Sequence, residues 1–146
     1  MTRRSKKTIV FIIISVVLAS SIYSYILWNK PHKDIKDASA EATTAINLYH
    51  LFATDSLEAK SEFLNRVVKV SGIVKGVSMN ADKKIIVLFE TSVSGASVNC
   101  TMEEPGLNAK PGDSISLKGL CVGYIGGDES MGLPGDVYVV RCYRAI

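Results

Sequence analysis

The chain has 146 residues, enough for one domain with an appendage. Residues 1–36 carry seven Lys or Arg against one acid, whereas residues 37–146 carry ten bases against thirteen acids. The larger part is therefore mildly acidic, which argues against nucleic-acid binding, because that affinity comes mainly from neutralised phosphates.

A stretch without charged residues, residues 8–28, follows four basic residues at the N-terminus. Its apolar core at 9–27 would extend about 28 Å as a helix, close to the ~30 Å thickness of the hydrocarbon layer of a bilayer. Aromatic residues that suit a membrane interface gather at its far end, where Trp28 lies. We predict a transmembrane signal-anchor helix over 8–28 after a basic tail at 1–7.

The basic tail also predicts how this helix is oriented. Positively charged flanks stay in the cytoplasm, so the rest of the chain would lie outside it. This indicates a single-pass membrane protein with its C-terminal domain outside the cytoplasm. A cleaved signal peptide is the alternative, but such peptides usually have an apolar core of about 7–15 residues.

Residues 29–36 contain Pro31 and mixed charges, and we expect a short linker there. Apolar residues then recur at spacings of three and four over 37–53, which predicts an amphipathic helix. Asp55 and Glu58 fit the capping box of a second short helix. Residues 37–65 are therefore expected to form a helical lead-in.

Five segments with the character of strands follow, and turn residues separate them: 66–77, 84–90, 97–102, 114–124 and 137–144. The first has Gly72 at its middle, and the fourth contains Gly119. A strand that curls around a small barrel needs a residue without Cβ where it bends. We predict an all-β fold, a five-stranded OB-fold barrel over 66–146, preceded by the transmembrane helix and one or two short amphipathic helices.

Four blocks of this region occur together in one known family: residues 56–74, 98–100, 111–123 and the closing strand with Cys142. The chain thereby resembles the tRNA_anti-like OB-fold family over roughly residues 40–146. The resemblance implies an OB-fold and a small bacterial envelope protein. Together with the predicted span, it places the chain in the bacterial inner membrane as a single-pass protein with a periplasmic C-terminal domain. Many relatives carry a lipobox where this chain has an apolar span. The family name records a fold relationship to anticodon-binding domains and does not imply that this chain binds tRNA.

Two of the three cysteines, Cys121 and Cys142, would come close if the last two strands pair as a hairpin. We expect Ile115, Leu117, Gly119 and Cys121 to face inward on the fourth strand, and Tyr138, Val140 and Cys142 on the last one. An oxidising compartment permits a disulfide between Cys121 and Cys142, which would contribute about 3 kcal/mol by closing a loop of about 20 residues. The alternative is that these two and Cys100 are buried thiols.

The sequence does not show a constellation of catalytic residues. Its two histidines, His32 and His50, both lie outside the predicted barrel. This excludes a histidine base in the barrel, and also the haem attachment that periplasmic OB-fold haem chaperones make through a histidine near the end of the barrel. The sequence contains no Cys-x-x-Cys pair, which is the spacing that would indicate a zinc site. We expect neither an enzyme nor a cofactor or metal.

OB-folds bind ligands on their second and third strands and on two neighbouring loops. A nucleic-acid face would interleave aromatic and basic residues, but only Phe89 and the pair Lys83 and Lys84 fit that description. The better contact candidate is the glycine-rich loop between the last two strands, although it could equally be a plain surface loop. Its candidate contact residues are Gly126, Gly127, Asp128, Glu129 and Met131.

These inferences predict a non-enzymatic, membrane-anchored binding module. Its ligand would be a protein or another envelope component, and the acidic barrel argues against nucleic acid. The alternative is an OB domain that binds an oligonucleotide or an oligosaccharide.

Overall fold

The computed structural model describes residues 3–29 and 34–146. The chain divides into two compact units, Met1–Asp34 and Ile35–Ile146. Ile35 is buried in the core of the second unit, so the predicted linker at 29–36 ends earlier than expected. Residues 30–33 of that linker lie outside the described part of the chain.

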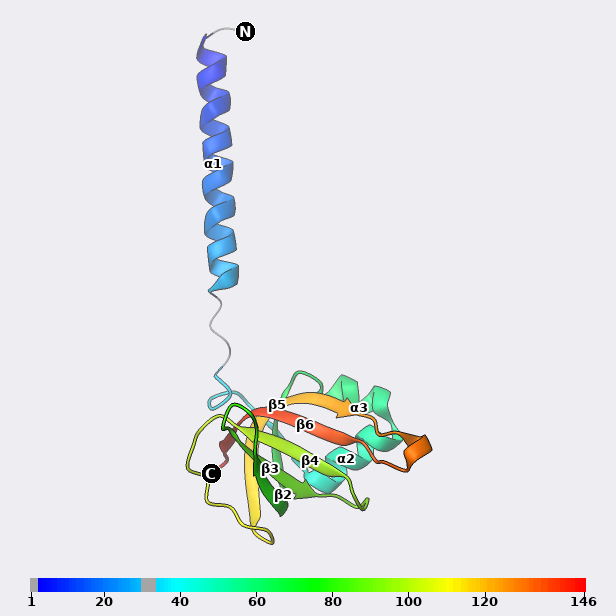
Figure 1. Ribbon diagram of the computed structural model, residues 1–146. Coiled ribbons are helices and arrows are strands. Elements are labelled where there is room, and N and C mark those ends of the chain that lie inside the picture. The colour runs from blue at the N-terminus through cyan, green and yellow to red at the C-terminus, as the bar shows by residue number, and fades with distance from the viewer. Residues whose placement is uncertain (1–2, 30–33) are drawn as a thin grey trace. The chain divides into compact units, whose positions relative to one another are not determined.

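The first unit is a single helix, α1 (Arg3–Trp28), drawn in blue in Figure 1. Within it, the 22 residues Lys7–Trp28 are long and apolar enough to cross a membrane. The side chains of these residues are exposed. The helix predicted over 8–28 is confirmed as a helix, and it starts several residues earlier than predicted.

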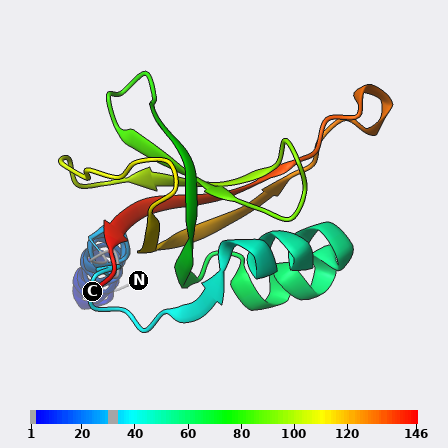
Figure 2. The same cartoon turned by 90° about the horizontal axis from the view of Figure 1, so that it is seen from below.

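The second unit consists mostly of strands. Its elements are β1 (Glu41–Thr44), α2 (Ala45–Thr54), α3 (Ser56–Phe63), β2 (Val67–Met79), β3 (Ile85–Glu90), β4 (Ser97–Met102), β5 (Ser114–Ile125), the 3-10 turn η1 (Glu129–Met131) and β6 (Asp136–Arg144). The strand order is β1-β2-β3-β4-β6-β5, and β2 also pairs with β5 (Figure 2). That last pairing closes β2 to β6 into the predicted five-stranded barrel. Only β4 and β6 run parallel within the barrel.

The predicted helix over 37–53 is wrong in its first part. Residues Glu41–Thr44 form β1 instead, which pairs in parallel with β2 and places Thr44 opposite Ser71. The helix then begins at Ala45, because the side chain of Thr44 accepts a hydrogen bond from the Asn47 backbone N–H at 3.1 Å. This N-cap and the β-branched Thr43 favour an extended backbone up to that point.

The helix α2 closes one end of the barrel. It contacts β2, β3, β4 and β6, and it buries four side chains, Ala45, Leu48, Tyr49 and Phe52. The second helix is confirmed with its predicted cap, since an Asp55 carboxylate oxygen accepts from the Glu58 backbone N–H at 3.1 Å. Asn65, with a φ of 59°, turns the chain from α3 into β2.

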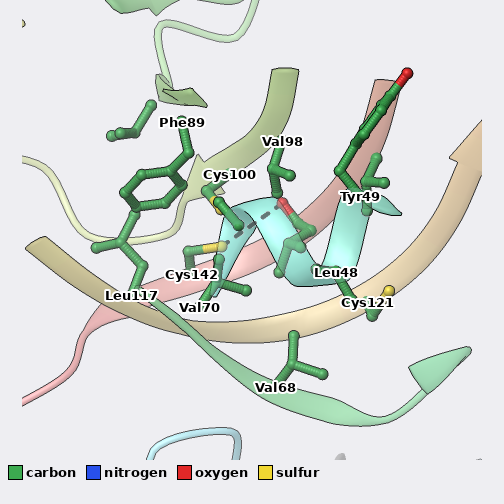
Figure 3. Packing of buried hydrophobic residues seen from close by; sticks show 14 of the residues in the cluster. Leu48, Tyr49, Val68, Val70, Phe89, Val98, Cys100, Leu117, Cys121 and Cys142 are labelled. Atoms are coloured by element: carbon green, nitrogen blue, oxygen red, sulfur yellow. Dashed lines mark hydrogen bonds between the residues drawn. The ribbon is translucent and has the colours of Figure 1, made fainter. Parts of the chain in front are cut away.

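The barrel interior is filled by side chains from all five strands (Figure 3). On β5 the prediction of inward-facing Leu117 and Cys121 is confirmed. On β6 it is wrong for Tyr138 and Val140, because the residues that face inward are Val137, Val139 and Cys142.

A bulge in β6 explains this change of face. Cys100 pairs with Val139, but Met102 pairs with Cys142, so β6 contains one extra residue at this point. Arg141 has a φ of 54°, the left-handed conformation that such a bulge requires. An extra residue reverses the alternation, and Cys142 therefore points into the core.

Gly119 makes room for this bulge from the neighbouring strand β5. A Cβ atom there would lie 2.6 Å from the Cys142 Sγ atom and 2.9 Å from the Val140 carbonyl oxygen. Gly72 has a packing role as well, since a Cβ would lie 3.1 Å from both the Ala45 Cβ and a ring carbon of Phe89. The irregularity expected at Gly72 itself falls further along β2, between Val74 and Gly76.

Candidate functional site

The three cysteines lie together in the barrel core and are free thiols (Figure 3). Cys121 is paired with Val139, three positions before Cys142, so the disulfide predicted between Cys121 and Cys142 is not formed in this structure. The register of β5 and β6 sets Cys142 apart from Cys121, and the Cys142 thiol lies beside that of Cys100. Whether a disulfide forms on oxidation stays a prediction.

The surroundings of Cys100 and Cys121 favour the protonated form of both thiols. A hydrogen bond with the Cys142 thiol and burial together raise the pKa of Cys100 well above its usual range. Burial raises the pKa of Cys121 to about 11. The Cys142 thiol donates to the Val139 carbonyl oxygen over 3.6 Å. Because a thiolate is the reactive form of cysteine, this cluster has the character of packing and not of catalysis.

The predicted contact loop connects β5 and β6 as residues 126–135. Ile125 pairs with Asp136, so the loop is centred next to Met131, as the sequence predicts. Two glycines of the loop are required because backbone atoms lie too close to them for a side chain to fit. A Cβ on Gly127 would lie 1.7 Å from the Leu133 carbonyl oxygen, and one on Gly135 would lie 2.2 Å from that of Ile125.

Asp128 shapes the tip of this β5–β6 loop. Its carboxylate accepts hydrogen bonds from both the backbone N–H and the hydroxyl of Ser130, which lower the pKa of Asp128. Its carbonyl oxygen accepts from the backbone N–H groups of Met131 and Leu133 at 3.1 and 3.0 Å. The predicted contact residue Asp128 therefore holds the loop in shape, and the predicted residue Glu129 begins η1.

Exposed apolar side chains project from this loop and from Ile125, the last residue of β5. Ile125, Met131 and Leu133 are 64%, 71% and 57% exposed. Of these three residues, only Met131 is among the contact residues predicted from the sequence. Ile125 and Leu133 could have been found as large apolar residues within a glycine-rich segment, where a surface loop has no need of them.

A cavity of about 420 Å³ lies between the β5–β6 loop and the two helices. Phe52, Lys60, Tyr124 and Leu133 are among the residues that line it. The Tyr124 ring is fixed there, because it stacks on Phe52 with ring centroids 6.4 Å apart and meets the Tyr49 ring edge-on at 6.0 Å. Burial and the Tyr124 hydroxyl raise the pKa of Tyr49.

The outer face of β3 and β4, where OB-folds bind ligands, has no basic side chain. Its outward side chains are the half-buried Ile86, Leu88, Asn99 and Thr101 and the exposed acid Glu90. Phe89 is fully buried and is not available for stacking on a ligand.

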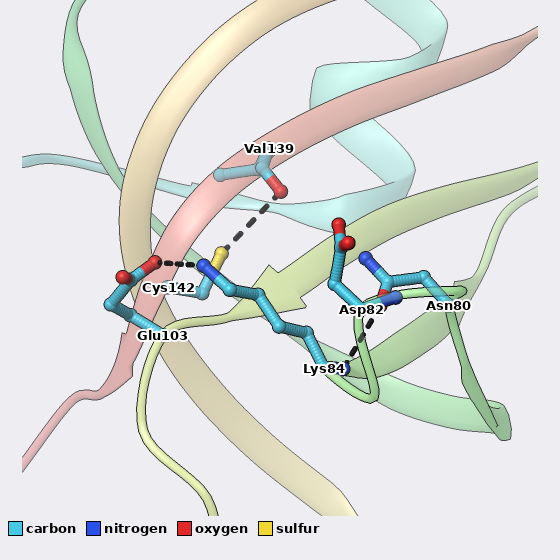
Figure 4. Close-up of polar contacts among 6 residues, drawn as sticks. All are labelled: Asn80, Asp82, Lys84, Glu103, Val139 and Cys142. Carbon is cyan, nitrogen blue, oxygen red and sulfur yellow. Dashed lines mark hydrogen bonds and ion pairs between the residues drawn. The ribbon is translucent and has the colours of Figure 1, made fainter.

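The turn between β2 and β3 adds little positive charge to this face. Lys84 is paired with Glu103 at 2.9 Å, and its backbone N–H donates to the side chain of Asn80 at 2.9 Å (Figure 4). The neighbouring Lys83 is exposed. The predicted Lys83 and Lys84 pair therefore presents one unpaired charge among the described residues.

The described residues do not bring three His, Cys, Asp or Glu side chains together in a group that could hold a metal ion. His50 is exposed on α2. The features that remain as a candidate site are the β5–β6 loop, the cavity beside it and the outer face of β3 and β4.

Comparisons with known proteins identify the family but not a ligand. A solved structure with partial similarity is that of a putative aspartyl-tRNA synthetase from Leishmania major Friedlin, at 9% identity and a TM-score of 0.42. The match covers 80% of this chain and 22% of that one. No curated protein matches the chain. The profile of the tRNA_anti-like family, a family of binding OB domains, matches residues 1–130, and the chain belongs to this family.

Proposed function

We propose that this protein is a membrane-anchored, extracytoplasmic OB-fold module that binds a protein or another envelope component and has no enzymatic activity. The β5–β6 loop is the contact region. Its exposed Ile125, Met131 and Leu133 are the observation that carries the proposal, because large apolar side chains on a shaped loop suit a protein surface.

The anchor in this proposal is α1. Its segment Lys7–Trp28 has the length and the apolar character of a membrane span. The basic residues before it support a cytoplasmic N-terminus, which would place the barrel outside the cytoplasm. A spanning helix with exposed apolar side chains on all sides needs no protein partner to be stable in lipid.

An oligonucleotide- or oligosaccharide-binding domain is the second candidate, since OB-folds bind both classes. The face of β3 and β4, which has no basic side chain and carries the exposed Glu90, favours the first candidate over an oligonucleotide. Binding of a single strand depends on a positively charged groove and on exposed aromatic rings, and Phe89 is buried.

A topology experiment tests the anchor. Asp37→Cys provides an accessible thiol, whereas the three natural cysteines are buried. In intact cells we expect a membrane-impermeant maleimide to label Asp37→Cys from outside and to leave Lys7→Cys unlabelled until the membrane is permeabilised. Labelling of Asp37→Cys only after permeabilisation would contradict the proposed orientation.

A binding experiment separates the two candidates. The full chain in neutral detergent is mixed with a fluorescent single-stranded polynucleotide, and in a second arm with oligosaccharides, at about 0.15 M salt, where non-specific charge effects are screened. We expect no change in anisotropy up to the highest protein concentration. Saturable binding in either arm would replace the first candidate with the second.

A further inference from the structure

A second cavity, of about 590 Å³, lies on the outer side of β2, β5 and β6. Four of the residues that line it are basic, namely Lys36, Lys69, Lys118 and Arg144. Among the described lining residues one is acidic, Glu104, and one is aromatic, Tyr143. We call this cavity the basic pocket.

The single acid in the basic pocket is already engaged. Glu104 forms an ion pair with Lys36, and the Lys36 ammonium also lies over the Tyr143 ring, 4.7 Å from its centroid. The Lys118 ammonium donates to the Lys36 carbonyl oxygen at 2.8 Å, which fixes its position but does not neutralise its charge.

The other three basic side chains of the pocket are not paired with an acidic side chain among the described residues. Lys69 and Lys118 are directly opposite on β2 and β5. Like charges in such a cross-strand pair are destabilising. In the described part of the chain, no ion pair involves Lys69, Lys118 or Arg144. The fold therefore holds three positive charges around one hollow at a cost to its own stability.

The positive charge around the basic pocket contrasts with the charge of the unit as a whole. Residues 35–146 contain eleven Lys or Arg against thirteen Asp or Glu, so the unit as a whole is slightly acidic. Four of those eleven bases line this one pocket. A local positive field on an acidic domain attracts a small anion selectively, and it does not give general affinity for polyanions.

We propose that the basic pocket binds a phosphate group, presented by the headgroup of an anionic phospholipid. The planar guanidinium of Arg144 can pair with two phosphate oxygens, and the ammonium groups of Lys69 and Lys118 supply charge-assisted hydrogen bonds. The Tyr143 hydroxyl offers a further donor.

The source of the phosphate follows from the anchor, so this inference rests on the proposed function. Lys36, which lines the basic pocket, comes eight positions after Trp28, the last residue of α1. Even a fully extended chain covers at most about 29 Å over that interval. If α1 spans a bilayer, the basic pocket is thus held near the lipid headgroups.

The test uses the full chain in nanodiscs. Neutral discs of phosphatidylcholine are compared with discs that also contain phosphatidylglycerol at about three lipids in ten, and lysine acetylation rates are read by peptide mass spectrometry. We expect acetylation of Lys69 and Lys118 to slow at least threefold in the anionic discs. Lys83, exposed and outside the pocket, is the internal control and should change less than twofold.

A second arm distinguishes a lipid from a soluble phosphate. Inorganic phosphate is added to the chain in neutral discs. Protection only in anionic discs supports the lipid headgroup, whereas protection by inorganic phosphate shows that the pocket takes a free phosphate. Unchanged rates of Lys69 and Lys118 in both arms would overturn the proposal.

A variant pair makes the result specific. Arg144 is exposed, so Arg144→Gln leaves the fold intact and should remove at least half of the protection. Lys83→Gln is the matched control and should keep all of it. Equal protection in both variants would contradict the role of the basic pocket. The proposed anchor can fail separately, because membrane association is read by flotation, and the soluble-phosphate arm does not depend on it.

Discussion

Lys69 and Lys118 are directly opposite one another on β2 and β5, two like charges in one cross-strand pair. Both are half-buried, and both line the basic pocket with Arg144. Charges arranged in this way weaken a sheet, so their position is better explained by a ligand than by stability. The β5–β6 loop, at the other end of β5 and β6, carries the exposed apolar residues of the proposed contact region. One barrel thus presents two chemically different surfaces.

The cost of this arrangement can be measured directly. Lys69→Glu converts the like-charge pair into an opposite-charge pair and should raise the free energy of unfolding by about 0.5–1 kcal/mol. The same change should abolish the protection of Lys118 in anionic nanodiscs. Lys83→Glu, outside the pocket, should do neither. A Lys69→Glu protein that unfolds more easily in denaturant would show that Lys69 stabilises the barrel.

The bulge in β6 depends on Gly119. Gly119→Ala places a methyl group 2.6 Å from the Cys142 Sγ atom and 2.9 Å from the Val140 carbonyl oxygen. We expect it to lower the free energy of unfolding by about 2–3 kcal/mol, because the backbone on β6 cannot move aside easily. Thermal or denaturant unfolding followed by circular dichroism provides the measurement.

Gly76 is the matched control for that substitution. It also lies in a strand, and a Cβ there has no atom within 4 Å. Gly76→Ala should therefore change the free energy of unfolding by between zero and about 1 kcal/mol of stabilisation. Similar losses for the two alanine variants would refute the close contact between Gly119 and the bulge.

The buried thiols make stability fall at alkaline pH. The pKa of Cys121 is about 11 in the folded protein against an ordinary value of 9.0. Between these values the unfolded chain releases the proton and the folded chain keeps it, so a rise in pH favours unfolding. The free energy of unfolding should drop by up to about 2.7 kcal/mol from this group between pH 9 and 11, with no contribution below pH 9.

A variant isolates the contribution of Cys121 from that of other groups that titrate in the same range. Cys121→Ala should be less stable than the natural protein at pH 8, because it leaves a small cavity. Its stability should then depend less steeply on pH between 9 and 11. Denaturant titrations at each pH give both values, and parallel pH profiles for the two proteins would contradict the raised pKa of Cys121.

The barrel could be predicted from sequence because its signals are local. Alternating apolar residues, turn residues and two glycines place five strands with small errors at their ends. The start of α2 could not be placed correctly. Ala42 and Ala45 continue a helical spacing, but the helix begins only after Thr44, whose side chain caps it. The strand pairing of β1 with β2, which decides the matter, is a long-range contact that no local pattern reveals.

The sites were less predictable than the fold. The predicted inward face of β6 was wrong for Tyr138 and Val140, which precede the bulge. A single residue in a left-handed conformation, Arg141, changes the alternation there. The loop centred near Met131 could be predicted from its glycines. The basic pocket could not, because Lys36, Lys69, Lys118 and Arg144 are far apart in sequence and meet only through the register of β2, β5 and β6.

The contact role of the β5–β6 loop is the central claim, and photo-crosslinking tests it most directly. A photoreactive phenylalanine analogue replaces Met131, which is 71% exposed, or Met79, which is 69% exposed at the end of β2. Met79 lies at the end of the β2–β3 hairpin, whereas Met131 lies in the β5–β6 loop. In native membranes the Met131 position should crosslink to a discrete protein, and the Met79 position should not.

A substitution that should weaken the contact is combined with the crosslinking measurement. Leu133→Asp, in the loop but at an exposed position, should reduce the crosslink formed from position 131 at least fivefold while thermal unfolding stays unchanged. Loss of the crosslink with an intact barrel is the result predicted by a contact loop. The same crosslinked species from both positions, unaffected by Leu133→Asp, would contradict it.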